Sequence, residues 1–562
     1  MQSKGYRGSA AIGFMLLVAA VPAGADCPPA DDRIADIAGP EPVASVGDSV
    51  RVRGVITGDY RGDDALRGFF LQQSAADDGA PPRGTFVFTP DRPPDAGGYG
   101  PGAEVVVAGE VSEHREQRQI GWVDAITVCD RPGLPEPADL PFPSAERDAW
   151  EALAGVKVRV TEPLTVTGNY ELVRYGTLDL AARGRLYQPT QLADYDGADH
   201  DARRLTLDDG RYVTYPETVP FLDAEGTRRV GSVIPELTGV LTHAFDDWRI
   251  HPLATDQVEW ISANPRPDPP GRPPGGVRIV GFNVEDYFLT LGDRGAQTQA
   301  ELTRQREQLE AVATGLRPDL FGIVEVENEP AAVADLAQRL GEAAGVAGGY
   351  AHFNVDAPVG TDRIRVALAW DPERVEPVAG PFFDDDPVHH RPPIAAHFRF
   401  GDDGPGKLVA VVHHKAKRGC PDEGDVDRGQ GCWNERRTEQ SQALAQFLAR
   451  KREETGTERV LIIGDINSYA REDPVELLAQ AGYGDLLRRL PPAARSTYVF
   501  RGMSGNLDVA LASEALADSV EGVAVWDINA DEPAELHEIR PVAGPWRSSD
   551  HDPVIVDVAT PD

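Results

Sequence analysis

The stretch "RVLIIGDINSYAREDPVELL" (459–478) contains a β-strand, a polar turn and the start of a helix. Its apolar run has the length of a strand and ends at Asp465 and Asn467. A helix is predicted to begin at Asp473, because Asp is a favoured N-cap residue and Pro474 suits the first helical position. The run is apolar on both faces, so its sheet should be covered on both sides. We therefore expect an α/β domain in which a buried strand ends in polar side chains.

Other apolar runs of strand length after residue 276 are also bounded by polar side chains. These side chains are Asn283 and Glu285 after "VRIVGF", Glu325 after "LFGIV", His413 and His414 after "KLVAVV", Asp508 before "VALAS", and Asp550 and His551 before "PVIVDV". Carboxylates and amides without thiolates favour a hard cation, Mg²⁺ or Mn²⁺, with Ca²⁺ as a further option. A histidine among aspartates is a typical general acid or base near neutral pH. If these ends converge, a phosphate ester would meet both a Lewis acid and a proton acceptor.

The triplet Asp550, His551 and Asp552 has a second interpretation when it is taken alone. Asp and Pro are common in solvated turns, where they are selected for local backbone reasons. The polar ends of the other strands favour a site over a plain turn.

The length of 562 residues predicts several domains. The Pro- and Gly-rich stretch "NPRPDPPGRPPGG" (264–276) is predicted to be a linker. Before it, alternating strands with glycine kinks predict an OB-fold-like β domain over residues 26–132 and a second β-rich, OB-like module over 133–263. Residues 277–562 form the predicted α/β domain. OB-like barrels bind oligonucleotides or serve as spacers, and neither barrel shows a groove of basic and aromatic residues.

The N-terminus has the features of a secretory signal peptide. Lys4 and Arg7 precede the apolar run "AAIGFMLLVAAV", and small residues follow up to Ala25. The run is too short to span a membrane comfortably. We therefore expect cleavage of residues 1–25 and a secreted protein, extracellular or periplasmic, without a membrane anchor.

The cysteines agree with export. The chain has four, Cys27, Cys129, Cys420 and Cys432, and an even number in an oxidising compartment predicts disulfides. Three pairings are possible; we favour Cys27 with Cys129 and Cys420 with Cys432, because each pair falls within one predicted domain. A zinc site is the alternative, but neither pair has the C-x-x-C spacing that is usual in such sites.

The formal net charge of −36 limits the functions that the surface could perform. A strongly acidic protein repels polyanions at long range, which counts against a nucleic-acid binder with a broad basic surface. An enzyme that engages phosphates through metal ions and a few local arginines remains compatible with this charge.

Taken together, the motifs "FNVEDYF", "GIVEVEN", "HHKAK", "GDINSYAREDP", "GNLDVALAS" and "SSDHDP" resemble, in this order, those of the endonuclease/exonuclease/phosphatase superfamily, which includes DNase I-like enzymes. The segments "GQGCWNERR", "TYVFRG" and "WDINADEP" are similar to those of its secreted bacterial nucleases, which carry OB-like N-terminal modules. The resemblance implies a four-layer α/β (α+β) sandwich of the DNase I-like type at the C-terminus, preceded by all-β OB-like modules. It covers residues 277–560 strongly and the β modules weakly.

The resemblance also implies a secreted, divalent-metal-dependent phosphodiesterase, an endonuclease that hydrolyses DNA or also RNA. One alternative keeps the chemistry and changes the substrate, as in phosphatases, nucleotidases and sphingomyelinase-like members. Another alternative is a non-catalytic protein that binds its partner through the OB-like domains. Against it, the chain retains every proposed ligand of the active site. No protein partner is evident.

The resemblance assigns roles to individual residues. Glu325 would be the principal metal ligand, together with Asn283, Glu285 and Asp550. The catalytic set would be His413, Asp465, Asn467, Asp508 and His551. Within it, Asp465 and Asn467 would orient the attacking water or protonate the leaving oxygen, and Asp508 would pair with His551. His414 is an alternative to His413, and Asp552 would cap the turn.

Two further groups of residues remain to be placed. Lys415, Lys417 and Arg437, with Arg418 and Arg436, are predicted to form a local substrate-binding patch, with a solvated loop as the alternative. The stretch "FFDDDPVHHRPP" (382–393) mixes Asp and His as a metal site does, but its Pro content and charge density favour a surface loop.

Overall fold

The computed structural model describes residues 27–38, 42–73, 81–92, 98–115, 117–401, 406–536 and 542–560. The predicted signal peptide, residues 1–25, lies outside the described residues. Among the helices of these described segments, none has the length and apolar character needed to cross a membrane.

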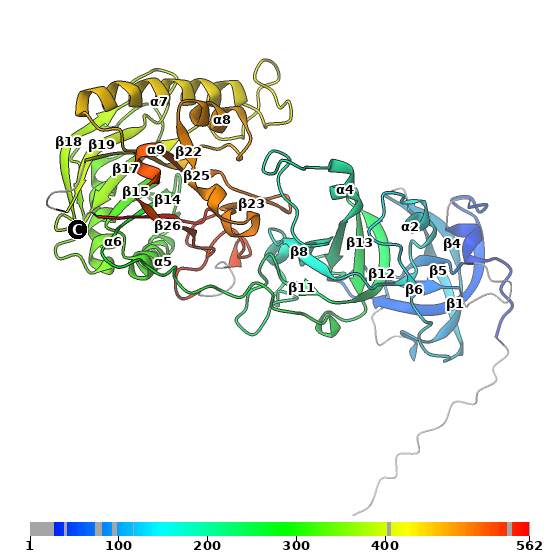
Figure 1. Ribbon diagram of the computed structural model, residues 1–562. Coiled ribbons are helices and arrows are strands. Elements are labelled where there is room, and N and C mark those ends of the chain that lie inside the picture. The colour runs from blue at the N-terminus through cyan, green and yellow to red at the C-terminus, as the bar shows by residue number, and fades with distance from the viewer. Residues whose placement is uncertain are drawn as a thin grey trace, which may run out of the picture.

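The chain first forms a closed barrel of five strands in the order β1-β2-β3-β5-β4 (Figure 1). The strands are β1 Ser49–Tyr60, β2 Gly68–Gln72, β3 Gly84–Phe88, β4 Glu104–His114 and β5 Gln117–Asp130. Only β3 and β5 pair in parallel among the barrel's strand pairs. Gly54 allows the close approach of two strands, because a Cβ there would lie 2.6 Å from the Gln72 carbonyl oxygen. The predicted disulfide between Cys27 and Cys129 is present and ties the chain before the barrel to β5.

The second β module is one sheet in the order β11-β8-β9-β10-β13-β12-β7-β6. Its strands are β6 Ala138–Asp139, β7 Lys157–Val160, β8 Leu164–Gly168, β9 Thr177–Ala182, β10 Arg204–Asp208, β11 Val233–Ile234, β12 Leu237–Ala244 and β13 Asp247–Pro252. Its six central strands follow the order β8-β9-β10-β13-β12-β7. This order matches that of the first barrel: β9, β10, β13 and β12 correspond to β2, β3, β5 and β4, and β7 and β8 together correspond to β1. The parallel pair β10 and β13 corresponds to β3 and β5. The two β modules therefore share one strand order.

The C-terminal domain contains two six-stranded sheets, in the orders β16-β17-β15-β14-β27-β26 and β18-β19-β20-β21-β25-β22. The first sheet has β14 Val277–Tyr287, β15 Leu320–Glu327, β16 Ala351–His352, β17 Ile364–Trp370, β26 Val520–Val525 and β27 Val554–Val558. The second has β18 Val375–Phe383, β19 Ile394–Phe400, β20 Lys407–His413, β21 Val460–Asp465, β22 Tyr483–Asp485 and β25 Asp508–Ser513. The helices are α5 Gln299–Leu316, α6 Pro330–Ala344, α7 Asn434–Thr455, α8 Asp473–Gln480 and α9 Glu514–Ala517.

These elements form the predicted four-layer sandwich. One face of each sheet contributes to a shared core that includes Ile279 and Ile463. The opposite face of the first sheet packs against α5 and α6, and that of the second packs against α7 and α8. Both sheets are therefore covered on both sides, which explains why their strands are apolar on both faces. The predicted fold class is confirmed.

The N-cap of α8 differs from the predicted one by one residue. Asp473 is the first helical residue, and Glu472 occupies the N-cap position with an extended backbone. Pro474 still lies within the first turn, where its missing N–H costs no helical hydrogen bond. Glu472 instead uses its side chain to bind Lys417 and Thr190, so tertiary contacts decide which residue precedes the helix.

The predicted linker, residues 264–276, lies against the C-terminal domain. Arg266 forms an ion pair with Glu532 at 2.7 Å, and the Trp526 indole N–H donates to the Pro267 carbonyl oxygen at 3.2 Å. These contacts attach the connection to the domain that follows it.

Candidate active site

The polar strand ends converge at one edge of the sandwich. The pairs β14–β15 and β20–β21 are parallel, so their carboxyl ends lie at the same edge of each sheet. β25 and β27 run antiparallel to their neighbours β21 and β14, so their amino ends lie at that edge too. Because the two sheets pack face to face, side chains from both meet there.

The second sheet aligns three of the predicted catalytic residues. His413 pairs with Asp465 in register, and Asp465 pairs with Asp508. Nε2 of His413 lies 3.4 Å from the Asp465 carboxylate and 3.5 Å from that of Glu325, which comes from the first sheet. The site is therefore built across the seam between the two sheets.

His551 and Asp508 form a buried pair. Nδ1 of His551 lies 2.7 Å from the Asp508 carboxylate, and both residues are at most 5% exposed. Burial opposes a charge on the imidazole, but Asp508 and Asp550 outweigh it and raise the pKa of His551 well above its ordinary value. The Nε2 atom lies 4.0 Å from carboxylate oxygens of both Asp465 and Asp550. His551 is thus held with Nδ1 engaged and Nε2 directed toward the carboxylates.

Glu325 adopts an unusual backbone conformation. Its φ of 68° lies in the left-handed region, at a register shift between Val324 and Val326 in the pairing of β15 with β17. A left-handed conformation in a residue other than glycine costs about 1–3 kcal/mol. The bulge breaks the alternation of side chains along β15, and the Glu325 carboxylate approaches His413. Local strain therefore accompanies the placement of the predicted principal metal ligand.

The carboxylates of the site destabilise one another's charge. Burial, followed by the charges of Asp286 and Asp550, raises the pKa of Glu325 to about 8. Burial and Asp508 raise the pKa of Asp465 to about 6, against the opposing effect of His551. Glu285 is exposed to solvent, but desolvation within the site, followed by the charge of Asp550, raises its pKa to about 7. A bound cation would relieve this repulsion.

The donor atoms fit a hard divalent cation. Glu325, His413 and Asp465 each place one donor atom within 4.8 Å of the others, as do Asp465, Asp508 and His551. Asp550 adds a carboxylate that is about one-third exposed. The carboxylate oxygens among these donors, without any thiolate, suit Mg²⁺ or Mn²⁺. Glu325, predicted to be the principal metal ligand, lies in the first of these two groups, and Asp465, predicted to be catalytic, lies in both.

Two amides orient the carboxylates. Asn283 donates from Nδ2 to Asp465 at 3.4 Å, and its Oδ1 accepts the Glu285 backbone N–H at 3.1 Å. Asn467 donates from Nδ2 to Asp465 at 2.9 Å and to the His414 carbonyl oxygen at 3.2 Å. Both amides thus hold the Asp465 carboxylate in place.

The two consecutive histidines point in different directions. His413 faces Glu325 and Asp465, whereas Nε2 of His414 lies 3.2 Å from the Ser441 hydroxyl on α7. Burial lowers the pKa of both imidazoles well below its ordinary value. His413, the last residue of β20, therefore lies in the site, whereas His414, which follows the strand, faces α7.

The predicted substrate-binding patch does not form as expected. Arg437 is fully buried, with its guanidinium donating to the Ser468 hydroxyl and to the carbonyl oxygens of Cys432 and Gln430. Lys417 donates to Glu472. Arg437 cannot contact a substrate from this position, and the assignment is corrected: its guanidinium holds a loop in place.

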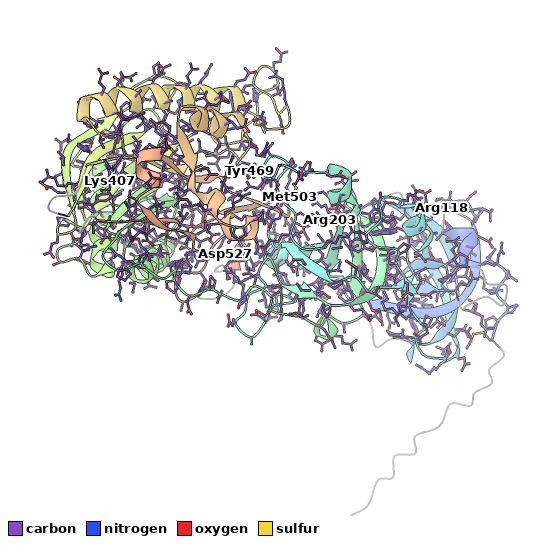
Figure 2. All side chains as sticks on the ribbon, viewed as in Figure 1. Arg118, Arg203, Lys407, Tyr469, Met503 and Asp527 are labelled. Carbon is purple, nitrogen blue, oxygen red and sulfur yellow. A yellow bond between two sulfur atoms is a disulfide. The ribbon has the colours of Figure 1, made fainter. Side chains whose placement is uncertain are left out.

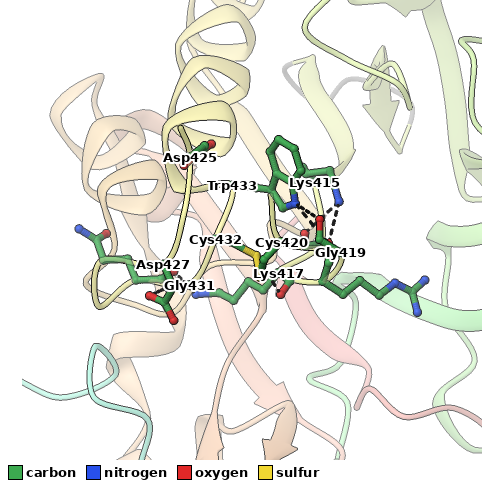
Figure 3. Close-up of a disulfide and its surroundings, with 12 residues drawn as sticks. Lys415, Lys417, Gly419, Cys420, Asp425, Asp427, Gly431, Cys432 and Trp433 are labelled. Carbon is green, nitrogen blue, oxygen red and sulfur yellow. Dashed lines mark hydrogen bonds between the residues drawn. A yellow bond between two sulfur atoms is a disulfide. The ribbon is translucent and has the colours of Figure 1, made fainter. Parts of the chain in front are cut away.

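Lys415 belongs to the same loop, which the predicted disulfide between Cys420 and Cys432 closes. Its ammonium group donates to the carbonyl oxygens of Ala416 and Arg418 and lies 5.1 Å from the centre of the Trp433 ring. Figure 3 shows Lys415 and Trp433 beside the disulfide between Cys420 and Cys432. Lys415 and Lys417 therefore stabilise the loop beside the site in this conformation.

The stretch 382–393, predicted to be a surface loop, is partly buried. Asp384 and His389 form a buried pair at 3.1 Å. Arg391 donates to the His414 carbonyl oxygen, and its charge acts on Glu325 and Asp465. The sequence offered no periodic signal for Arg391, because its position depends on tertiary contacts such as that with the His414 carbonyl oxygen.

Tyr498 was also missed as a residue of the site. Its ring centre lies 4.8 Å from that of the His551 imidazole. The motif "TYVFRG" contains it, but nothing in the motif places the ring. Asp552, predicted to cap a turn, accepts the backbone N–H groups of Ile528 and Asn529 at 2.8 and 2.7 Å.

The part of the chain that builds this site matches a known protein family. Residues 282–551 match the model of the Endonuclease/Exonuclease/phosphatase family. No curated protein matches the sequence significantly.

Several solved structures are similar to the C-terminal half of the chain. A humanized TDP2 from D. rerio has 17% identity and a TM-score of 0.36, covering 51% of this chain and 100% of that one. The human Nocturnin catalytic domain with bound sulfate has 16% identity and a TM-score of 0.33, covering 51% and 95%. A mannosyl-6-phosphatase from Bacteroides thetaiotaomicron has 14% identity and a TM-score of 0.32, covering 50% and 98%.

Proposed function

Residues 282–551 belong to the Endonuclease/Exonuclease/phosphatase family, and from this premise we propose that the protein is an exported, divalent-metal-dependent nuclease that hydrolyses DNA or RNA. Family membership makes the chain a hydrolase of phosphate esters. The metal, the nucleic-acid substrate and export are the parts that we propose.

The observation that carries the proposal is the His551–Asp508 pair, at 2.7 Å, beside a cluster of carboxylates with raised pKa values. The imidazole can hold a proton or accept one, because Asp508 stabilises its charged form. The positive charges of nearby side chains are too weak to return the pKa values of these carboxylates to their ordinary range. A proton carrier and a site for a cation therefore lie side by side.

The residues divide the chemistry between them. Glu325, Glu285 and Asp550 would hold the cation, which when bound supplies positive charge to a phosphate ester. Asp465, held by Asn283 and Asn467, is placed to orient a water molecule or a leaving oxygen. His551 would transfer a proton at Nε2 while Asp508 fixes the ring through Nδ1. His413, whose lowered pKa keeps it neutral, can donate a hydrogen bond to a phosphate oxygen.

A small phosphate ester is a second candidate substrate. The predicted cations Lys417 and Arg437 are engaged within the protein, and the net charge is −36. Long-range attraction of a polyanion is therefore weak, and a phosphomonoester would need fewer contacts than a nucleic acid.

Cleavage assays distinguish these substrates. Supercoiled plasmid, RNA and p-nitrophenyl phosphate would each be incubated with the protein, with EDTA or with added Mg²⁺, and His551→Ala would serve as the control for contaminating nucleases. We expect Mg²⁺-dependent nicking of plasmid that His551→Ala lacks. Hydrolysis of the monoester alone would replace the nuclease with a phosphatase, and plasmid cleavage unaffected by EDTA would contradict the metal dependence.

Export is supported by the two disulfides, which persist in oxidising compartments. Residues 1–25 would be removed on secretion. N-terminal sequencing of the protein recovered from the medium or periplasm should begin at Asp26. A mature chain that retains Met1 would contradict the proposal.

A further inference from the structure

The second β module touches the active-site region through a small hairpin. β23 (Tyr498–Phe500) and β24 (Met503–Gly505) form a two-stranded sheet that no other strand joins among the described residues. Figure 1 shows β23 at the junction between the C-terminal domain and the module that contains β8. Met503 and Tyr469, labelled in Figure 2, lie at the same junction. A two-stranded hairpin alone is only marginally stable in water, so its conformation depends on its neighbours.

The module supplies those neighbours. Gln188 donates from Nε2 to the Phe500 carbonyl oxygen at 2.9 Å and to that of Met503 at 3.1 Å, one from each strand. Ser504 exchanges backbone hydrogen bonds with the same segment: its N–H donates to Leu186 at 2.9 Å, and its carbonyl accepts from Gln188 at 3.0 Å. Gln188 is only 6% exposed. The segment 186–188 thus fixes both strands of the hairpin.

The tip of the hairpin also lies against the module. Arg501 and Gly502 form the turn with φ values of 52° and 68°. The Arg501 carbonyl oxygen accepts from Arg204 at 3.4 Å. A Cβ on Gly502 would lie 2.9 Å from the Asp179 carboxylate of β9, so the turn has little room to shift.

The root of the hairpin reaches the catalytic pair. Tyr498 places its ring 4.8 Å from the His551 ring. The neighbouring Thr497 hydroxyl accepts the backbone N–H of Asp508 at 3.3 Å. Displacement of the hairpin would therefore change the packing of His551 and the support of Asp508 together.

We propose that the segment 186–188 of the second β module is a positioning element of the active site, and that Gln188 holds the hairpin so that Tyr498 packs against His551. The second β module then helps to position the active site and is not a spacer. Gln188 touches neither substrate nor reacting atoms and acts through Tyr498.

Separate contacts keep the module docked, which allows Gln188 to be tested alone. Arg229 forms a buried ion pair with Glu532 at 2.6 Å, and Asn169 donates to the Asp531 carbonyl oxygen at 2.8 Å. Neither contact involves the hairpin. We expect Gln188→Ala to loosen the hairpin while the two domains stay together.

The first test does not require activity. Protein labelled with ¹³C at histidine Cε1 would give a His551 resonance, identified by its loss in His551→Ala. The Tyr498 ring should shift this resonance, so Gln188→Ala should move it toward its position in Tyr498→Ala. Gln257→Ala is the matched control, because Gln257 lies exposed on the same module, and it should leave the resonance in place.

The second test is kinetic and rests on the proposed phosphodiesterase function. Gln188→Ala should lower kcat by about tenfold with little change in KM, since small misplacements of catalytic groups cost up to about a hundredfold. Tyr498→Phe should keep the ring and most of the rate. Gln188→Ala should add little to the loss in Tyr498→Ala, because both changes remove one interaction.

The two tests separate failure of this proposal from failure of the proposed function. A protein without nuclease activity would still show the histidine shift. An unchanged resonance and an unchanged kcat in folded Gln188→Ala would overturn the positioning role, as would full additivity with Tyr498→Ala. If Gln188→Ala does not fold, Gln188→Glu keeps the size of the side chain, removes the donor, and should give the same shift and rate loss.

Discussion

The Asp508 carboxylate lies 2.7 Å from Nδ1 of His551, and residues 43 positions apart in the sequence are thereby joined by a hydrogen bond. β25 carries Asp508 at its first position, and His551 precedes β27 in the other sheet. The pair thus bridges the two sheets, and its geometry depends on their packing.

Replacement of His551 by alanine should abolish most of the activity without unfolding the protein. Loss of proton transfer costs about a hundredfold to ten-thousandfold in kcat, and Mg²⁺ binding should be nearly unchanged. Asp508→Asn should have a milder effect, because it leaves the imidazole in place and weakens only its orientation and charge. Steady-state kinetics and isothermal titration with Mg²⁺ test this; a His551→Ala protein with nearly wild-type kcat would contradict it.

Glu325→Gln should weaken Mg²⁺ binding. An amide lacks the negative charge, and the affinity should fall by at least about tenfold, since even changes to residues that orient metal ligands cost about 10- to 100-fold. Raising the Mg²⁺ concentration should partly restore activity in Glu325→Gln but not in His551→Ala. Equal rescue of both variants would contradict the assignment of Glu325 as a metal ligand and of His551 as a proton carrier.

The stability of the chelated protein should fall as the pH rises. The pKa of Glu325 is raised from 4.5 to about 8, so the folded state binds more protons than the unfolded state between these values. The free energy of unfolding in EDTA should therefore decrease from about pH 5 to about pH 8. The raised pKa of His551 acts in the same direction, because its stabilising charge is lost as the pH rises.

Added Mg²⁺ should oppose this loss, increasingly so at higher pH, where fewer protons compete with the cation. Thermal midpoints in EDTA and in Mg²⁺ across this range measure the effect. Glu325→Gln is the control and should show a shallower pH dependence. A Mg²⁺ stabilisation that is independent of pH would argue against cation binding at these carboxylates.

Removal of the Cys420–Cys432 disulfide should destabilise the loop beside the site. The two residues are 12 positions apart, and closure of so short a loop contributes about 3 kcal/mol in the chain-entropy model. A double Cys→Ser variant should be cut faster by protease between residues 418 and 431. The Cys27–Cys129 pair, in another domain, provides the control, since its removal should leave this loop resistant.

Arg437→Met should lower stability and leave the salt dependence of nucleic-acid cleavage unchanged. Its guanidinium donates to Ser468, Cys432 and Gln430, and each buried acceptor left unpaired costs about 1–3 kcal/mol. Arg418→Ala is the matched comparison, because Arg418 is exposed on the same loop and should cost little stability. A flatter salt dependence in Arg437→Met would restore its role in substrate binding.

The sequence by itself determined the features that follow from local composition and order along the chain. Apolar runs on both faces indicated covered sheets, and the polar residues after them, such as Asp465, indicated an edge with a site. Leu302, Leu309 and Val312 are buried on one face of α5, and their helical spacing can be read from the sequence. The disulfide pairs followed from the division of the chain into domains.

Only the tertiary structure decided which side chains reach the site. His413 and His414 are adjacent and chemically identical, but His413, at the end of β20, contacts Asp465, whereas His414 contacts Ser441 on α7, and the prediction had to leave both open. Arg437 looked available because its burial comes from a loop folded over it. Gln188 lies 312 positions from Phe500, and no local pattern relates them. Such contacts depend on how separate domains pack, and packing is a property of the assembled surfaces, which sequence spacing does not encode.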